Sequence, residues 1–593
     1  MIHNRKIFVI QNITPLKKIL WSEENLSKNF PVHWLEEIVE EINSRKPNEI
    51  TLSTGKTPSG HIHLGILREI IICDGLRRIF EEHGKKVNNL LFFDSLDAAK
   101  RFPGYIPEKF QKKHLGKPFA MIPCPYENCN CESYAHHFGN ALVDTFPNFG
   151  IEIKTIWTHK LYKTKEMQEK IKIALENTDK IKEILKKYIL PTLREEDKEA
   201  FIEMQNNWMP VMAICENCNK IQHRDNKESI RPNRVKEYFH NEDVVSYVCE
   251  ACGYTGKLSI WSGRLKLNWR IDWPAKWALY KTTCEPAGKD HSVKGGAYDT
   301  GIELCQELYD YEGPVKVPYE WLRLGDQDMG TSKGHVFIPK KYLEIADPRI
   351  YRTIILRTNP IKHITFRIEE LSQYYDYYER MEDIYYNLEK TEGFEESRFF
   401  KYLYPLTQIS DIPKTKLKQL PLKLLTFLTQ IQNILSIDNL YEKAKTYMEK
   451  NGFKNVISLQ EFKILLTLTN NWLKEVKKII ESEEDPKIKK EIIRKVEIFT
   501  IPEEIDENLI NIMDEKQIKG IQLLREYLKN TEDLESDLIQ NKIFNIAKND
   551  LILPPRKFFE SIYQIILGKK SGPRLGPFLS LLDKNWLLKR MNV

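Results

Sequence analysis

The stretch Gly55-Lys-Thr-Pro-Ser-Gly-His-Ile-His-Leu-Gly65 constrains the fold of this chain more than any other segment. A short run of β-forming residues, 49–53, precedes it, and the following residues carry apolar side chains on a helical repeat: Leu64, Leu67, Ile71 and Phe80. This order predicts a strand, a glycine-rich turn and a helix. Glycines let the backbone approach a ligand closely, and the free amides of a helix N-terminus suit an anion. A plain strand-to-helix connection also needs glycine, so the turn alone does not establish an anion site.

Two further β-like runs, 87–93 and 151–157, are separated by long connections, which predicts a parallel sheet with insertions. An amphipathic helix is expected over 33–43 before the first strand. Beyond about residue 340 amphipathic helices dominate. One is expected from Pro421 through Leu425, Leu428, Ile431 and Leu435, and another is marked by apolar residues between Phe462 and Val476. The chain is therefore expected to be α/β in its first part and mainly helical in its last 230 residues or so.

Length and charge set broad limits. A chain of 593 residues exceeds the ~250–300 residues that one hydrophobic core can serve, so several domains are expected. Lys plus Arg is 90 and Asp plus Glu is 84, and this small excess permits RNA binding without requiring it. No apolar run approaches the ~18 residues that cross a bilayer, and Ile7-Phe-Val-Ile10 is too short for a secretory signal. A cytoplasmic protein with no membrane partner is expected.

Seven of the ten cysteines have metal-ligand spacing. The pairs Cys215-x2-Cys218 and Cys249-x2-Cys252 can each grip one side of a tetrahedral zinc ion, with redox pairing as the weaker alternative. A second set, Cys124-x4-Cys129-x-Cys131, offers three thiolates, and His136 or His137 can supply a fourth ligand. Both sites are expected to be structural, because four protein ligands leave no open position. The remaining cysteines, Cys73, Cys284 and Cys305, are expected to be inert core residues.

The loop carries a family resemblance. His63-Leu-Gly-Ile66, preceded by Pro58-Ser-Gly60, resembles the HIGH signature of class I aminoacyl-tRNA synthetases. Met329-Gly-Thr-Ser-Lys-Gly334, which follows the β-like run 317–324, resembles the lysine-bearing loop (KMSKS) that closes the ATP site in that family. Asp328 stands where the full signature has lysine, and Gly330-Thr331 replaces a more usual serine-containing pair.

This resemblance implies roles for individual residues. His63, Lys333 and His61 are the expected catalytic side chains, acting with Mg²⁺ on the phosphates of ATP. The expected ATP-binding residues in these two segments are Pro58, Ser59, Gly60, His61, His63, Gly65, Ser332 and Lys333.

Among class I enzymes the lysyl group resembles this chain best. The segments that carry the resemblance are 267–274 (Leu-Asn-Trp-Arg-Ile-Asp-Trp-Pro), Gly288-Lys-Asp-His291, Gly295-Gly-Ala-Tyr-Asp299 and 360–366. They imply a lysine pocket drawn from Gly55, Thr57, Trp269, Asp272, His291 and Tyr298, and a ribose-facing segment with Gly295, Gly296 and Asp299. A flat apolar slot suits the lysine methylenes, and a carboxylate or neutral imidazole suits the ammonium.

Plainer explanations of these residues remain open. Trp269 and Trp273 can be core residues. Asp272 can pair with Arg270 on the surface. For the cysteine-rich segment, the resemblance favours His137 over His136 as the fourth ligand.

The implied fold is an α/β Rossmann-type catalytic domain with zinc-binding insertions, followed by an all-α anticodon-binding region. The expected divisions are 1–120 and 261–345 for the two catalytic halves, 121–260 for the insertions, 346–410 for a helical stem-contact domain and 411–593 for the anticodon-binding domain. The implied function is ATP-dependent attachment of lysine to tRNA(Lys) through lysyl-adenylate. The partners are then tRNA(Lys), L-lysine and ATP, with two structural Zn²⁺ ions. A monomer is the working assumption, since the sequence does not fix the oligomeric state.

Two alternatives remain. One is a class I synthetase for another amino acid, such as glutamate or arginine, which needs a differently charged pocket. The other is a non-catalytic RNA-binding paralogue, and the altered residues around Met329 are its best support.

Overall fold

The computed structural model describes residues 32–224, 230–328, 336–417, 419–451, 457–532 and 534–593. The chain divides into two compact units. The first contains the described residues up to Leu343 together with Asp347–Phe366 and Tyr378–Lys414. The second contains Glu344–Ala346, Arg367–Tyr377 and Thr415–Val593. The division into five domains expected from the sequence is finer than this and stays a prediction.

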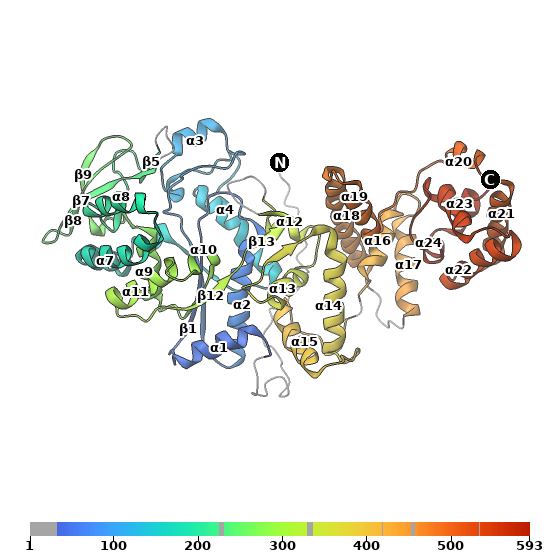
Figure 1. Cartoon of the computed structure of the whole chain (residues 1–593), viewed down its shortest axis with the longest axis horizontal. Coiled ribbons are helices and arrows are strands. Elements are labelled where there is room, and N and C mark those ends of the chain that lie inside the picture. Colours follow the sequence, from blue (N-terminus) through green and yellow to red (C-terminus); the bar gives the residue numbers. More distant parts are fainter. Residues whose placement is uncertain (1–31, 225–229, 329–335, 418, 452–456, 533) are drawn as a thin grey trace. The chain divides into compact units, whose positions relative to one another are not determined.

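A five-stranded parallel sheet in the order β12-β11-β1-β2-β3 organises the first unit (Figure 1). Its strands are β1 (Ile50–Lys56), β2 (Val87–Phe93), β3 (Lys154–Trp157), β11 (Cys284–Gly288) and β12 (Val315–Tyr319). All the neighbouring strands pair in parallel, as the sequence predicts. The chain order reverses at β1, which lies between β2 and β11, and such a reversal opens a ligand crevice at the carboxyl ends of the strands.

Two predicted strands differ in their limits. The run 151–157 becomes a strand only at Lys154. The run 317–324 is two strands, β12 and β13 (Leu322–Leu324), broken at Glu320 and Trp321. Arg68 holds the residues of the break, because its guanidinium donates to the carbonyl oxygens of Glu320 and Trp321. The Trp321 oxygen also accepts a hydrogen bond from the amide of Ile364 in β15.

Helices beside the sheet begin where the sequence predicts. The helix expected over 33–43 is α1 (Trp34–Ser44), which buries Trp34, Leu35, Val39 and Ile42. The helix expected from His63 starts as a 3₁₀ turn, η2 (Leu64–Ile66), and continues as α2 (Leu67–Glu82). Nearly all of α2 is buried, so it is a core helix of this unit.

Long insertions interrupt the sheet. Between β2 and β3 lie α3 (Glu108–His114), η3 (Phe119–Met121), α4 (Tyr134–Val143) and η4 (Phe146–Phe149). After β3 come α5 (Thr158–Leu161), α6 (Lys165–Glu176), α7 (Thr178–Ile189), η5 (Leu190–Thr192) and α8 (Glu195–Asn206). An antiparallel sheet in the order β10-β4-β7-β8-β9 follows, built from β4 (Val211–Ala213), β7 (Arg234–Phe239), β8 (Val244–Val248), β9 (Thr255–Ser259) and β10 (Leu265–Leu267). Smaller elements are β5 (Gln222–Arg224), β6 (Ile230–Pro232) and η6 (Ile260–Ser262).

The chain returns to the parallel sheet through α9 (Trp269–Tyr280), α10 (Lys289–Ser292) and α11 (Ala297–Tyr309). After β12 a small sheet in the order β14-β13-β15 forms from β13, β14 (Gln327–Asp328) and β15 (Ile364–Phe366). The helices that follow β14 are α12 (Pro339–Leu343), α13 (Pro348–Arg357), η7 (Ile368–Glu370), α14 (Leu371–Tyr385) and α15 (Phe394–Thr407).

From Thr415 onward the described residues contain helices and no strand. They are α16 (Leu422–Gln430), α17 (Ile437–Lys450), α18 (Leu459–Ser482), α19 (Pro486–Val496), α20 (Glu507–Asn511), α21 (Glu515–Asn530), α22 (Ser536–Asn545), the π-helical turn η8 (Ile546–Asp550), α23 (Pro555–Leu567), α24 (Leu575–Leu581) and α25 (Lys584–Arg590). One apolar core with Leu428, Phe462 and Phe578 joins them. The helix predicted from Pro421 ends early, at Gln430, although Ile431 and Leu435 are buried as the pattern suggested.

Membrane spans are absent from the described parts of the chain, where no helix combines the length and the apolar character needed to cross a bilayer.

A buried carboxylate ties α2 to later helices of the first unit. Asp74 lies 2.9 Å from Arg77, 2.9 Å from Arg78 and 2.8 Å from Arg352 of α13. Burial alone would raise the pKa of Asp74, but the three guanidinium groups hold it well below its usual range. Arg352 and Arg78 also donate to the carbonyl oxygen of Leu406 at the end of α15. The cluster therefore joins α2, α13 and α15.

Removing this charge should destabilise the first unit strongly. We expect Asp74→Asn to lower the free energy of unfolding by about 3–5 kcal/mol, because it leaves buried guanidinium groups without their counterion. Urea unfolding followed by circular dichroism measures the change. The matched control is Glu81→Gln, since Glu81 is a largely solvated partner of Arg77 and should cost about 0–1 kcal/mol. Equal effects of the two substitutions would contradict this account.

Candidate active site and metal sites

The glycine-rich loop lies at the carboxyl edge of the parallel sheet. It leaves β1 after Lys56 and enters η2 at Leu64, which confirms the predicted order of strand, turn and helix. Pro58 and Gly60 are buried, whereas Ser59, His61, His63 and Gly65 are partly exposed. Gly55, the last residue but one of β1, is exposed at the same edge.

Residues from the connection after β2 fix the loop. Thr57 donates its hydroxyl hydrogen to Asp97 over 2.7 Å. The Tyr134 hydroxyl donates to the Ser59 carbonyl oxygen over 2.9 Å, and the His61 amide donates to the Tyr105 hydroxyl oxygen over 2.7 Å. The loop conformation thus depends on the insertion between β2 and β3 as well as on its own glycines.

Both loop histidines are neutral near pH 7. Burial, and then the positive charge of Lys56, lower the pKa of His63 to about 3. Its Nδ1 atom is buried and has no hydrogen-bond partner among the residues that the structure describes. Burial also lowers the pKa of His61, whose ring packs 4.9 Å from Tyr105 and 5.1 Å from Phe138. Both side chains can therefore serve a phosphate as hydrogen-bond donors and not as cations.

A cavity of about 300 Å³ brings together four of the predicted site residues: Trp269, His291, Gly295 and Gly296. The Trp269 indole is 46% exposed, so it is not a core residue, and its ring lies 5.5 Å from that of His291. Trp273, the other tryptophan considered, does belong to a buried aromatic cluster with Trp277. The cavity offers an aromatic wall beside a neutral imidazole, since burial lowers the pKa of His291.

Four predicted pocket residues do not line this cavity: Gly55, Thr57, Asp272 and Tyr298. Asp272 is buried, lies 3.0 Å from Lys276 and accepts a hydrogen bond from Tyr162. The suggested surface pair of Asp272 with Arg270 is wrong, because residues two apart on a helix face different directions whereas residues four apart meet. Tyr298 is fully buried and donates its hydroxyl hydrogen to main-chain carbonyl oxygens of β11 and β12.

The Gly295-Gly296 turn needs glycine for backbone reasons. Gly295 has φ +74°, and a Cβ atom at Gly296 would come within 2.8 Å of the His291 carbonyl oxygen. Asp299 accepts a hydrogen bond from the Gly295 amide and pairs with Lys316, both over 2.8 Å. These three residues therefore shape the turn that borders the cavity.

The predicted residues Ser332 and Lys333 lie outside the described residues, as do Met329, Gly330 and Thr331. Their roles stay predictions.

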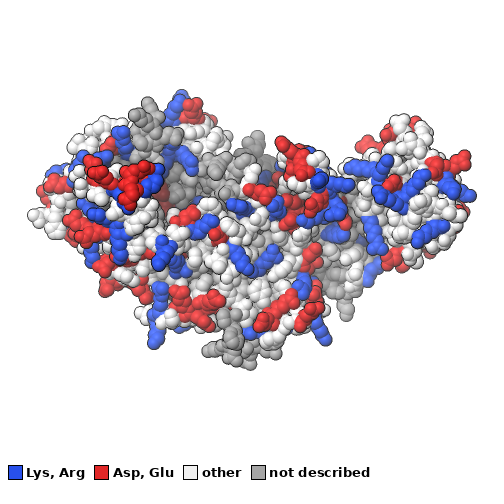
Figure 2. Space-filling view, in the orientation of Figure 1, with Lys and Arg blue, Asp and Glu red and all other residues white. Residues whose placement is uncertain are grey.

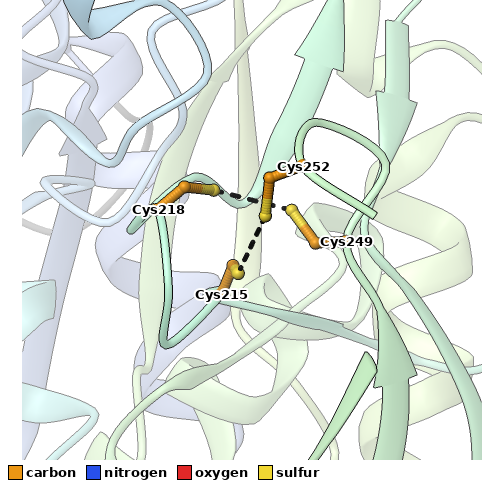
Figure 3. A group of neighbouring side chains, drawn as sticks. All are labelled: Cys215, Cys218, Cys249 and Cys252. Atoms are coloured by element: carbon orange, nitrogen blue, oxygen red, sulfur yellow. Dashed lines mark hydrogen bonds between the residues drawn. The ribbon is translucent and has the colours of Figure 1, made fainter. Parts of the chain in front are cut away.

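Four cysteines from the antiparallel-sheet insertion converge (Figure 3). The Sγ atoms of Cys215 and Cys252 are 3.8 Å apart, and those of Cys218 and Cys249 are 3.6 Å apart. These separations are far longer than the ~2.05 Å of a disulfide bond. A tetrahedral zinc ion with Zn–S bonds of ~2.3 Å separates its sulfurs by about 3.8 Å. The geometry fits a metal ion, and these four cysteines form no disulfide bond.

The second cluster lies beside the glycine-rich loop. His137 Nδ1 is 3.6 Å from Cys124 Sγ, 3.3 Å from Cys129 Sγ and 3.9 Å from Cys131 Sγ. A tetrahedral zinc ion separates a nitrogen from a sulfur ligand by about 3.5 Å. Cys124, Cys129 and His137, whose ligand atoms all lie within 4.8 Å of one another, could hold it. Cys131 does not belong to this group, and its place as a ligand stays a prediction. His136 instead faces Ser133 and Trp157. The three remaining cysteines are buried, as expected of core residues.

Several side chains of this region could not be identified from the sequence. Glu285 of β11 accepts hydrogen bonds from Trp273, Trp277 and Ser53, although no local motif marks it. Tyr188 and Ile189 of the inserted helix α7 line the cavity, and only the tertiary packing brings them there. Asp290, another lining residue, lies inside the quoted segment Gly288–His291 and could have been found.

Similarity to known proteins covers both units. Residues 32–407 match the family described as tRNA synthetases class I (K), and residues 439–593 match the one described as anticodon binding domain. The lysine--tRNA ligase of Methanocaldococcus jannaschii is 34% identical over 574 residues, which cover 95% of this chain and 100% of the relative. Those of Methanococcus maripaludis and Thermococcus kodakarensis are each 30% identical over 95% of this chain and cover 100% and 99% of their own lengths.

The neutral state of His63 predicts how its contribution depends on pH. We expect His63→Ala to raise KM for ATP roughly 10- to 100-fold, the cost of one hydrogen bond to a charged phosphate group. Because the folded-state pKa is lowered to about 3, the imidazole carries no proton charge at pH 6 or pH 8, and the loss should be equal at both. His63→Asn, which keeps an N–H donor, should recover part of it. A loss present at pH 6 and absent at pH 8 would reveal a cationic contact and contradict this account.

Proposed function

Because this chain belongs to the class I tRNA synthetase (K) family, we propose that it attaches lysine to tRNA in an ATP-dependent reaction. The observation that carries the proposal is the match to lysine--tRNA ligases over 95% of the chain, which spans the glycine-rich loop, the aromatic cavity and the helical C-terminal unit together. A nucleotide loop alone would fit many nucleotidyl transferases.

In the first step the lysine carboxylate attacks the α-phosphorus of ATP, a C–O–P bond forms, and pyrophosphate leaves. Such phosphoryl chemistry depends on positioning and on charge neutralisation, not on a protein nucleophile. His63 and His61 donate hydrogen bonds to phosphate oxygens at the N-terminus of α2, and Lys333 offsets the charge of the leaving group. Mg²⁺, bound through the phosphates, would neutralise part of their charge.

The aromatic cavity is the amino-acid site in this proposal. The Trp269 ring covers the methylenes of lysine, and the neutral His291 ring lies beside it. Asp290 lines the same cavity and is exposed, so its carboxylate can meet the lysine ammonium. Gly55 and Thr57 do not line this cavity, and the Thr57 hydroxyl binds Asp97 instead. Asp272 and Tyr298 do not contact lysine in this proposal, because their polar atoms already bind Lys276, Tyr162 and main-chain carbonyls.

In the second step the terminal 2′-hydroxyl of the tRNA attacks the carbonyl carbon of lysyl-adenylate, and AMP leaves. The match of residues 439–593 to an anticodon binding domain supports tRNA(Lys) as the partner. Lys and Arg are interspersed with Asp and Glu over the visible face of the chain (Figure 2). RNA recognition by stacking and hydrogen bonding, in addition to charge, is consistent with such a mixed surface.

Two zinc ions hold the insertions in this proposal. The ligands are Cys215, Cys218, Cys249 and Cys252 in one site and Cys124, Cys129, Cys131 and His137 in the other. Both sites are closed by protein ligands, so their role is to fix the fold. His137 of the second site lies on α4. The same helix carries Tyr134, whose hydroxyl donates a hydrogen bond to the Ser59 carbonyl oxygen. Zinc at this site therefore positions the glycine-rich loop.

ATP–pyrophosphate exchange with each amino acid in turn tests the amino-acid assignment. We expect exchange with lysine alone, because the chain matches lysine--tRNA ligases over 95% of its length and the cavity offers an apolar wall and a carboxylate to a lysine side chain. The assay is run with and without tRNA, since activation can require the bound tRNA. Exchange with glutamate or arginine would assign the chain to that amino acid instead of lysine. Exchange with no amino acid would support the alternative of an RNA-binding paralogue without catalytic activity.

Metal analysis separates the two zinc sites. We expect two zinc ions per chain, and Cys249→Ser and Cys129→Ser should each lose one. Cys129→Ser should raise KM for ATP more than Cys249→Ser does, because only its site contacts the glycine-rich loop through α4. Zinc is measured by atomic emission spectroscopy and KM by exchange. A full zinc content in both variants would overturn the ligand assignment.

A further inference from the structure

Lys56 stands at the junction between β1 and the glycine-rich loop. It is the last residue of β1, and its carbonyl oxygen accepts a hydrogen bond from the Asp94 amide over 3.0 Å. Side chains alternate along a strand, so Lys56 shares a face with Thr54. The Thr54 hydroxyl donates to Glu69 of α2, which fixes that face as the one beneath the loop and the start of α2.

Lys56 differs from the buried lysines at this edge in having no counterion among the described residues. Lys266 lies 3.0 Å from Asp97, and Lys276 lies 2.8 Å from Asp94 and 3.0 Å from Asp272. No ion pair of Lys56 is found among the residues that the structure describes. Glu69, its acidic neighbour, is engaged by the hydroxyl groups of Thr54 and Tyr319. An ammonium that is half-buried and unpaired gains free energy from an added anion.

The surroundings of Lys56 favour an anion. Its charge acts on the neighbouring His63 imidazole, whose buried Nδ1 has no partner among the described residues. The 16-residue helix α2 begins just beyond, and its free amides favour a negative group. Burial lowers the pKa of Lys56, which an adjacent phosphate would reverse.

We propose that the Lys56 ammonium binds a phosphate oxygen of ATP. The inference rests on the proposed function only in taking ATP as the nucleotide, and it does not depend on which amino acid is activated.

The test measures the affinity of the full-length chain for two probes without any amino acid: MgATP, and adenosine, which has no phosphate. We expect Lys56→Met to raise the Kd for MgATP roughly 10- to 100-fold, the range for a lost hydrogen bond to a charged group. The Kd for adenosine should stay within about 2-fold of wild type, and Lys56→Arg should recover most of the MgATP affinity. The matched control is Lys86→Met, at the opposite end of the same strands, where Lys86 pairs with Glu49 on the surface.

Two results would overturn the inference. One is unchanged MgATP affinity in Lys56→Met, and the other is an equal loss for adenosine and MgATP, which would mean that Lys56 only supports the fold. ATP–pyrophosphate exchange by the wild-type chain distinguishes failure of the lysine assignment from failure of the Lys56 proposal. If lysine supports no exchange but Lys56→Met still loses MgATP selectively, the lysine assignment fails and the role of Lys56 stands.

Discussion

The carboxyl edge of the parallel sheet depends on a buried network of opposite charges. Asp94 and Asp97 follow β2, Lys266 belongs to β10, and Asp272 and Lys276 belong to α9. These residues come from both sides of the long insertion, so the network joins the two halves of the catalytic fold. Burial raises the pKa of Asp94 to about 6, and Lys276 opposes the rise. Asp97 also accepts the Thr57 hydroxyl hydrogen, which extends the network to the glycine-rich loop.

The predictions from sequence that succeeded concern features that neighbouring residues determine. Strand, turn and helix around the loop are local, and glycine spacing with apolar periodicity suffices to predict them. The cysteine clusters are also largely local, because the cysteines lie in short groups of fixed spacing. A single approach of two such groups brings Cys215, Cys218, Cys249 and Cys252 together. Trp269 and His291 also come together at the cavity, because they lie on short segments around β11.

Burial and partner choice could not be predicted in the same way. Asp272 was considered as a lysine ligand or a surface partner of Arg270, and it is instead enclosed between Lys276 and Tyr162. The Tyr298 hydroxyl binds main-chain carbonyl oxygens of both β11 and β12. Glu285 links β1 to α9, because it accepts hydrogen bonds from Ser53 and from the indoles of Trp273 and Trp277. Each depends on contacts between segments far apart in the chain. The strand predicted over 317–324 is broken at Glu320 and Trp321, whose carbonyl oxygens accept hydrogen bonds from Arg68, a residue far away in the chain.

Transfer of lysine to tRNA is the most direct measurement of the central claim. Purified tRNA(Lys), incubated with the chain, ATP, Mg²⁺ and radiolabelled lysine, should acquire lysine through an ester bond that mild alkali hydrolyses. Labelled glutamate and arginine should not be incorporated under the same conditions. Charging with either of those amino acids, or none with lysine while the chain still binds MgATP, would contradict the assignment.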